Sequence, residues 1–98
     1  MSVIEFGKLK LRAGVTDAQF LAAEGKIRTG RIRQQPGYEG REVGKDADGM
    51  WYVIIRWATK ENAEAWTPVF MQDPDGQALA SLLDFGNTRQ EWFTTVSP

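Results

Sequence analysis

The chain has 98 residues, of which 42% are hydrophobic and 26% charged, and its 12 basic and 13 acidic residues give a formal net charge of -1. This length fits one domain over residues 1–98, and the charge argues against a nucleic-acid binder, which normally carries a basic excess. The absence of cysteine and histidine excludes disulfides, thiolate or imidazole metal sites, histidine-ligated haem and Ser-His nucleophiles. No apolar run approaches the roughly 20 residues of a membrane span, so we expect a cytoplasmic protein with no membrane or nucleic-acid partner.

The first predicted strand runs from Val3 to Leu11. Its apolar residues, such as Ile4 and Phe6, nearly alternate with charged ones, and Glu5 belongs to the charged set. Such alternation is typical of a strand that is buried on one face. The pattern slips around Gly7, which predicts a β-bulge there.

The first predicted helix has a clear start signal. Thr16 is expected to cap it, because Gln19 three residues later completes a capping box. Gly30 weakens the helix by about 1 kcal/mol relative to alanine, so tertiary packing must hold it. We expect the helix to end at Gln35, since the residue before Pro36 is disfavoured in the α region.

A hairpin is predicted in the middle of the chain, with strands from Tyr38 to Lys45 and from Met50 to Ala58. Asp46 to Gly49 forms the turn between them, because Asp-Gly supplies the positive φ that such turns favour. The second strand is apolar on both faces, and both must therefore be covered. The helices of so short a chain can cover only one face of its sheet, so we predict a homodimer in which the other face packs against the sheet of a second copy. The two faces of this strand carry Met50, Tyr52 and Ile54 on one side and Trp51, Val53, Ile55 and Trp57 on the other.

The sequence of the last part of the chain predicts two helices and a strand. Thr59 caps a helix from Lys60 to about Phe70, and Asp73 with Pro74 begins another that stops at Gly86. That last helix is expected to direct Ala78, Leu79, Leu82 and Leu83 inward, and Trp92 to Val96 forms the closing strand. The order β-α-β-β-α-β is the α+β, ferredoxin-like split βαβ arrangement.

Four segments in this order resemble the antibiotic-biosynthesis-monooxygenase family of dimeric α/β barrels, over most of the chain from Val3 to Val96. The resemblance implies a ferredoxin-like protomer whose sheet pairs with that of a second copy. The segments are Gln35-Pro36-Gly37-Tyr38, Gly40-Arg41-Glu42-Val43, Met50-Trp51-Tyr52-Val53 and Trp57-Ala58-Thr59-Lys60-Glu61.

The family includes cofactor-free oxygenases of polycyclic aromatics, quinol oxygenases and haem-degrading oxygenases. Many members carry a histidine nine residues after the tryptophan of the Trp-x-Ser/Thr-x-Glu motif, and Trp66 stands at that position here. This departure argues against haem degradation. What remains is similar to oxygenases that use an asparagine and a tryptophan beside a cavity between helix and sheet, without a cofactor. The resemblance thus implies catalytic roles for Asn62 and Trp66, which lie four residues apart on one helical face.

The implied reaction is the cofactor-independent oxidation of an electron-rich aromatic or polyketide-like small molecule. An electron-rich enolate or phenolate can pass an electron to dioxygen, and the enzyme must bind that anion and exclude water. Amide and indole N–H groups can stabilise the developing oxyanion. In this interpretation Arg56 holds an anionic oxygen, and Tyr52 and Phe70 shape an apolar pocket.

Structural roles compete with these assignments. Asn62 would be the third residue of a helix capped by Thr59, where an amide commonly reaches back to the cap. Trp66 would fill the core, as large aromatic side chains often do. The alternative is therefore a non-catalytic, small-ligand-binding or structural homodimer of the same fold. An open cavity beside Asn62 and Trp66 favours the enzyme, and a filled interior favours the alternative.

Overall fold

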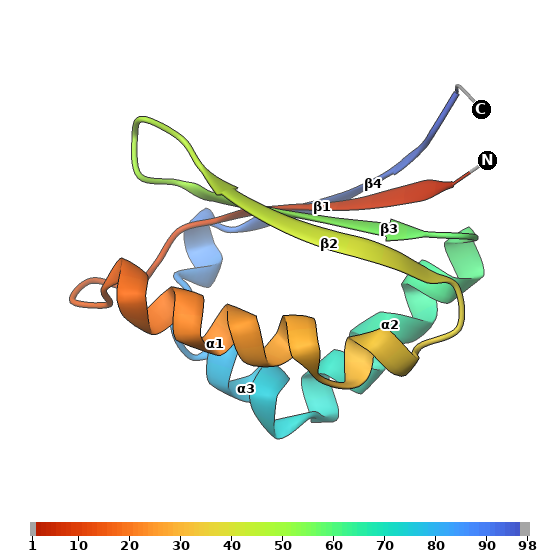
Figure 1. The fold of residues 1–98 in the computed structure, drawn as a ribbon. Helices are drawn as coiled ribbons and strands as arrows, with labels where there is room; N and C mark the ends of the chain where they lie inside the picture. Colours follow the sequence, from red (N-terminus) through yellow and green to blue (C-terminus); the bar gives the residue numbers. More distant parts are fainter. Residues whose placement is uncertain (1, 97–98) are drawn as a thin grey trace.

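The computed structural model describes residues 2–96 and shows a four-stranded sheet with all three helices packed on one of its faces (Figure 1). Two short 3₁₀ turns, Arg31–Gln34 and Phe85–Asn87, join the longer elements. Those elements are β1 (Val3–Leu9), α1 (Asp17–Thr29), β2 (Tyr38–Lys45), β3 (Trp51–Trp57), α2 (Lys60–Gln72), α3 (Pro74–Ala80) and β4 (Arg89–Thr94).

The strand order is β2-β3-β1-β4, and each neighbouring pair is antiparallel. The predicted α+β, ferredoxin-like fold is confirmed by this arrangement. The hairpin turn also forms as predicted, with Gly49 at a φ of 85°. The turn fixes the register of the hairpin, so that Arg41 lies opposite Ile55 and Val43 opposite Val53.

The predicted bulge at Gly7 is wrong. β1 pairs with β3 and β4 without a register shift, and the irregularity lies between Tyr38 and Gly40 of β2. Because β1 is regular, side chains two residues apart share a face. Glu5 therefore points to the same side as Val3 and Leu9, and it is buried at 5% exposure.

The helix α1 begins as predicted and ends earlier. Thr16 and Gln19 form the complete capping box. The helix stops at Thr29, because Gly30 adopts a non-helical conformation with φ -97° and ψ -140°, and a separate 3₁₀ turn continues to Gln34. Glycine is poor at holding helical backbone, and here this preference ends the helix before Pro36 is reached.

The last helices and strand keep their predicted order with shifted ends. The helix α2 runs two residues past Phe70, and α3 ends at Ala80 rather than near Gly86. Leu79 and Leu83 are buried as expected, but Ala78 is exposed, because successive residues of a helix are turned by about 100° and Leu79 faces the core. β4 begins at Arg89, three residues before the predicted start at Trp92.

The sheet has one covered and one uncovered face. Trp51, Val53, Ile55 and Trp57 of β3 point to the helices and are buried. No helix of residues 2–96 lies over the opposite face (Figure 1). Within the same residues, no helix has the length and hydropathy to cross a bilayer. The uncovered face carries Ile4, Phe6, Tyr52, Ile54 and Phe93.

Candidate active site

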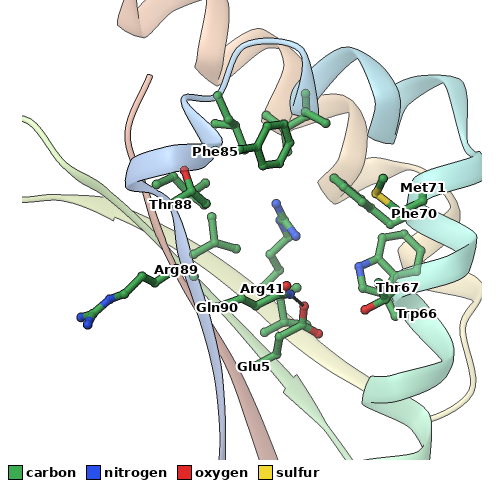
Figure 2. Close-up of a pocket in the computed structure, with 17 residues that line it drawn as sticks. Glu5, Arg41, Trp66, Thr67, Phe70, Met71, Phe85, Thr88, Arg89 and Gln90 are labelled. Atoms are coloured by element: carbon green, nitrogen blue, oxygen red, sulfur yellow. Dashed lines mark hydrogen bonds between the residues drawn. The ribbon is translucent and has the colours of Figure 1, made fainter. Parts of the chain in front are cut away.

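A cavity of about 160 Å³ lies between the covered face of the sheet and the helices. Its wall is mainly apolar and is formed by residues of the four strands, of α2 and α3, and of the segment that follows α3. Met71 and Phe85 line it and are 54% and 64% exposed, so the cavity reaches the surface beside them. Figure 2 shows Glu5, Arg41 and Gln90 on the sheet side, opposite Trp66 and Phe70 of α2. An apolar cavity with a few convergent polar groups is the usual form of a small-molecule site.

Glu5 is the carboxylate at the floor of the cavity. Trp57 donates a hydrogen bond from Nε1 to Glu5 Oε1 at 3.0 Å, and Gln90 donates one from Nε2 to Oε2 at 2.5 Å. Each carboxylate oxygen thus has one neutral donor, which fixes the orientation of the group. Burial raises the pKa of Glu5 above its ordinary value of 4.5, although these hydrogen bonds and the nearby charge of Arg41 act in the opposite direction.

This raised pKa makes stability depend on pH in a defined direction. Protonation of Glu5 is easier in the folded than in the unfolded chain, so the burial penalty is absent below about pH 4.5 and grows as the pH rises through the folded pKa. We expect the free energy of unfolding of Glu5→Gln, measured relative to that of the wild type, to increase as the pH rises from 4 to 8. Urea denaturation of both proteins across this range measures the difference, and a difference that is independent of pH would contradict the burial of a charged Glu5.

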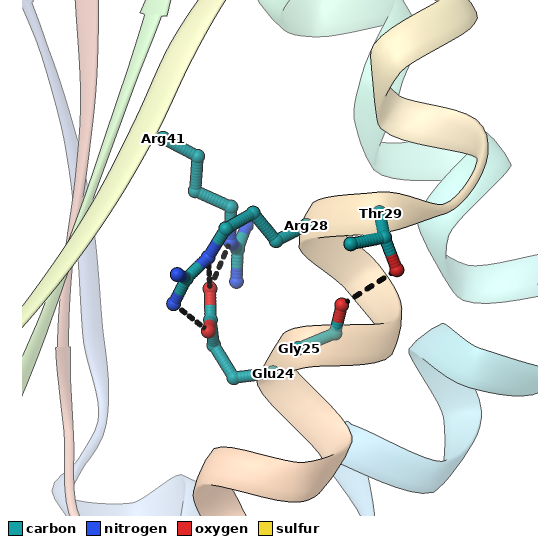
Figure 3. Close-up of polar contacts among 5 residues, drawn as sticks. All are labelled: Glu24, Gly25, Arg28, Thr29 and Arg41. Atoms are coloured by element: carbon teal, nitrogen blue, oxygen red, sulfur yellow. Dashed lines mark hydrogen bonds and ion pairs between the residues drawn. The ribbon is translucent and has the colours of Figure 1, made fainter.

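Arg41 brings a cation to the same cavity. Its side chain is 3% exposed, and its Nε donates to Glu24 Oε1 of α1 at 3.0 Å. Glu24 is fully buried and also accepts from Arg28 of the same helix (Figure 3). Within residues 2–96 the Arg41 side chain donates through Nε alone, and Figure 2 shows its guanidinium directed into the cavity. The terminal nitrogens of Arg41 are therefore free to bind an anion there.

Trp66 and Phe70, two residues predicted for the site, line the cavity together. Trp66 is 3% exposed and packs against Trp57 and Phe70, with ring centroids 6.3 and 5.9 Å apart. Its indole N–H has no hydrogen-bond partner among residues 2–96, and Figure 2 shows the nitrogen edge of the ring facing the cavity. Trp66 thus both fills the core and presents a donor to the cavity.

Asn62 lies one turn before Trp66 but does not line the cavity. Its backbone N–H donates to Thr59 Oγ1 at 3.1 Å, and the Thr59 hydroxyl donates to Asn62 Oδ1 at 2.8 Å. Its side chain also fits against Gly37, where a Cβ would come within 2.1 Å of Asn62 Oδ1. The structure therefore gives Asn62 the helix-capping role and separates it from the Trp66 indole.

Tyr52 and Arg56 lie on the uncovered face of the sheet and do not line the cavity. Side chains alternate along a strand, so the burial of Val53 and Ile55 directs these two residues away from the helices. Tyr52 packs against Phe6 and donates from its hydroxyl to Asp46 Oδ2 at 2.7 Å. The structure does not bring Tyr52 and Arg56 together with Trp66 and Phe70.

The prediction from sequence missed the two charged residues of the site. Glu5 lies an even number of residues from Val3 and Leu9. If β1 had been predicted as a regular strand without a bulge, this spacing would have placed the Glu5 carboxylate on the same face as these apolar side chains. Arg41 could have been found through the hairpin register, which places it opposite the buried Ile55. Among residues 2–96, no group of three acidic side chains gathers closely enough to hold a metal ion.

No family model matches this sequence, and no curated protein does either. Solved structures do match over nearly the whole chain. SnoaB from Streptomyces nogalater, a cofactor-independent oxygenase solved as an asparagine-to-alanine variant, is 17% identical with a TM-score of 0.78, and the match covers 99% of this chain and 95% of that one. A candidate antibiotic biosynthesis monooxygenase from Bordetella bronchiseptica is 13% identical with a TM-score of 0.79, and the match covers 98% of both chains.

The chain has the fold of the antibiotic biosynthesis monooxygenases. The resemblance seen in the sequence motifs is confirmed at the level of the fold. A dimeric ferredoxin-like protein of unknown function from a Jannaschia species also matches, with 11% identity, a TM-score of 0.73 and 97% and 100% of the two chains covered. The shared fold thus spans oxygenases and proteins of unknown function, and the residues of the cavity must carry the functional argument.

Proposed function

We propose that the chain is a cofactor-independent monooxygenase that oxidises a small, electron-rich aromatic molecule with dioxygen. One observation carries this proposal: a buried arginine cation and an indole N–H face a mainly apolar cavity. An aromatic anion needs an apolar wall for its ring and positive or hydrogen-bonding groups for its oxygen. Phe70 contributes to the wall, and Arg41 and Trp66 can hold the oxygen.

The same groups suit the reaction with dioxygen. A phenolate can pass an electron to dioxygen, whereas a neutral closed-shell phenol reacts slowly. Arg41 favours the ionised form of the substrate, since an opposite charge within a few ångströms stabilises an anion. Preorganised donors in a water-poor site stabilise oxygen anions far better than water-exposed groups do. Arg41 and Trp66 could thus favour both the phenolate and the peroxide that follows it.

The size of the cavity favours one aromatic ring over a fused polycyclic system. Its volume is about 160 Å³, whereas an apolar cavity of about 150 Å³ accommodates benzene. Drug-sized ligands occupy pockets of about 300–1,000 Å³. We therefore propose monocyclic phenols and hydroquinones as the preferred class of substrate.

Oxygen uptake by purified, metal-free protein tests this function. Substituted phenols and hydroquinones are compared with fused polycyclic phenols, after subtraction of uptake without protein. We expect turnover of the monocyclic class, and a loss of about 10²-fold in Trp66→Phe, which removes one oxyanion donor. Trp92→Phe is the matched control, because Trp92 is 45% exposed and lies outside the cavity lining. Binding of these phenols without any oxygen uptake would favour the non-catalytic alternative.

We further propose that the functional unit is a homodimer formed through the uncovered face of the sheet. Phe6 and Tyr52 pack together at the centre of that face, and Phe93 remains 49% exposed beside them. A large apolar patch that stays open to water usually marks an interaction surface. The Jannaschia protein, which has the same fold and is dimeric, supports a second copy of this chain as the partner.

The dimer has a direct test in sedimentation velocity at micromolar concentration. We expect a dimer for the wild type and a shift to monomer for Ile54→Lys, which places a charge at the centre of the uncovered face. Ala22→Lys adds the same charge on an exposed position of α1 and should leave the dimer intact. A wild-type protein that sediments as a stable monomer would rule out this interface.

A further inference from the structure

Glu5 has no role in the function as proposed so far, yet the fold holds it in the cavity at a cost. Burial makes the charged form of Glu5 less favourable, as its raised pKa shows. Within residues 2–96 Glu5 forms no ion pair, and the neighbouring Arg41 is paired through Nε with Glu24. A buried carboxylate held without a cation of its own is a frequent feature of catalytic sites.

Among residues 2–96, no other group that lines the cavity could accept a proton near neutral pH. The chain has no histidine and no cysteine. Of the residues that line the cavity, the ionisable ones are Glu5, Arg41 and Arg89, and both arginines remain protonated at such pH. Figure 2 shows Arg89 directed away from the cavity. Acid–base chemistry in this cavity therefore falls to Glu5.

We propose that Glu5 is the general base of the site: it takes the proton of a phenolic O–H bound beside Arg41 and returns it to the peroxide formed from dioxygen. This inference rests on the proposed function and assigns its proton transfers. Trp57 and Gln90 act as positioning residues, since their hydrogen bonds hold the two carboxylate oxygens. Arg41 holds the anion that is left behind, and Glu24 of α1 is the charge that fixes Arg41.

The steps balance for a hydroquinone, with dioxygen as the oxidant. Glu5 removes the phenolic proton and leaves the electron pair on the substrate oxygen. The anion passes one electron to dioxygen, and the semiquinone and superoxide join in a C–O bond at the adjacent ring carbon. Glu5 then returns its proton to the outer oxygen of the peroxide.

The second half of the sequence breaks the O–O bond. Glu5 takes the hydrogen of the oxygenated ring carbon as a proton, and the C–H electron pair forms the new C=O bond as hydroxide leaves. Hydroxide then takes the proton from Glu5 and becomes water. One hydroquinone and one dioxygen thus give one hydroxyquinone and one water, and Glu5 ends as the carboxylate.

The first test compares the turnover of the wild type, Glu5→Gln and Glu64→Gln over a range of pH. Glu64→Gln is the matched control, because it removes the same charge from an exposed position of α2 that lies outside the cavity lining and away from the uncovered face of the sheet. At pH 7 we expect Glu5→Gln to lose about 10²-fold or more in turnover, in the range typical of general bases. The loss should shrink when the pH exceeds the pKa of the phenol itself, because the substrate then arrives ionised. Glu5→Asp, which keeps a carboxylate on a shorter side chain, should retain part of the activity.

A second test does not depend on turnover. A nitrophenol absorbs visible light only when ionised, so its spectrum reports the proton directly. In Glu5→Gln, Arg41 still favours the anion, so each nitrophenol that binds in the ionised form should release one proton to the buffer. We expect the wild type to ionise bound nitrophenol below the pKa of the free compound without this release, because Glu5 keeps the proton. Such ionisation without any oxygen uptake would support Glu5 as the proton acceptor and reject the oxygenase function.

Two other outcomes overturn the assignment of Glu5. If Glu5→Gln turns over at the wild-type rate at pH 7, the oxygenase function is retained and Glu5 has no part in it. Equal release of protons to the buffer by both proteins, when they bind nitrophenol in the ionised form, would do the same. A wild type that neither oxidises nor binds these phenols would reject the function and the role of Glu5 together.

Discussion

Glu24→Ala is expected to lower the free energy of unfolding by about 3–5 kcal/mol, the cost of leaving a buried charge without its partner. Glu24 is fully buried, and its main buried partner Arg41 is 3% exposed. Burial lowers the pKa of Arg41, while the hydrogen bond and charge of Glu24 raise it. Without Glu24, the Arg41 cation would remain in the apolar interior facing the weaker influence of Glu5.

Urea denaturation with two further variants separates charge from packing. Glu24→Ala combined with Arg41→Met should be less destabilised than Glu24→Ala alone, because no charge is then left unpaired. Glu42→Ala, next to Arg41 but exposed, should stay within about 0.5 kcal/mol of the wild type. A cost for Glu24→Ala no larger than that of Glu42→Ala would show that the ion pair does not hold Arg41 in place.

Trp57→Phe is expected to cost about 2–4 kcal/mol, from a lost hydrogen bond to a charged group and a partly emptied space. Trp57 is completely buried, and its ring packs between Tyr38 and Trp66 with centroids 5.8 and 6.3 Å away. Its Nε1 donates to Glu5. Because that hydrogen bond lowers the pKa of Glu5, its removal should raise this pKa further.

A double-mutant cycle isolates the hydrogen bond from the packing of the ring. Trp57→Phe should cost less in a Glu5→Gln background, where no charged carboxylate has lost its donor. Trp92→Phe is the control for the substitution itself, since Trp92 is 45% exposed. Equal costs at positions 57 and 92 would contradict the coupling of Trp57 to Glu5.

Both predictions concern residues that hold the charged groups of the cavity in place. Glu24 holds Arg41, and Trp57 holds Glu5. Arg41 and Glu5 both line the cavity, one as a cation and one as a carboxylate. The arrangement places an anion-binding group and a proton acceptor beside the same apolar wall, so stability variants at Glu24 and Trp57 should also change the pH profile of turnover.

The two faces of β3 show what an alternating apolar pattern can predict from the sequence. The alternation in β3 correctly separated Val53 and Ile55 from Tyr52 and Ile54. The same alternation excludes Tyr52 and Arg56 from a cavity under the helices. These two residues were expected at the site because the resemblance placed the pocket between helix and sheet, and the alternation alone does not say which face of β3 the helices cover.

Local chemistry explains why the elements themselves were predictable. Thr16 and Gln19 form their capping box within four residues, and Gly49 turns the hairpin through its own backbone freedom. Such signals depend on neighbours in the chain and need no knowledge of the fold. The exceptions were also local in origin, since Gly30 stopped α1 before the expected signal at Pro36.

The sequence by itself determined the order of elements, the ferredoxin-like fold, and the absence of any histidine or cysteine chemistry. Only the tertiary structure decided which side chains share the cavity. Glu5 and Arg41 are 36 positions apart and on strands that are not neighbours, and they meet because β3 lies between β1 and β2. Long-range strand pairing and its register bring such residues together, and their charge is tolerated there only because Trp57, Gln90 and Glu24 supply partners inside the fold.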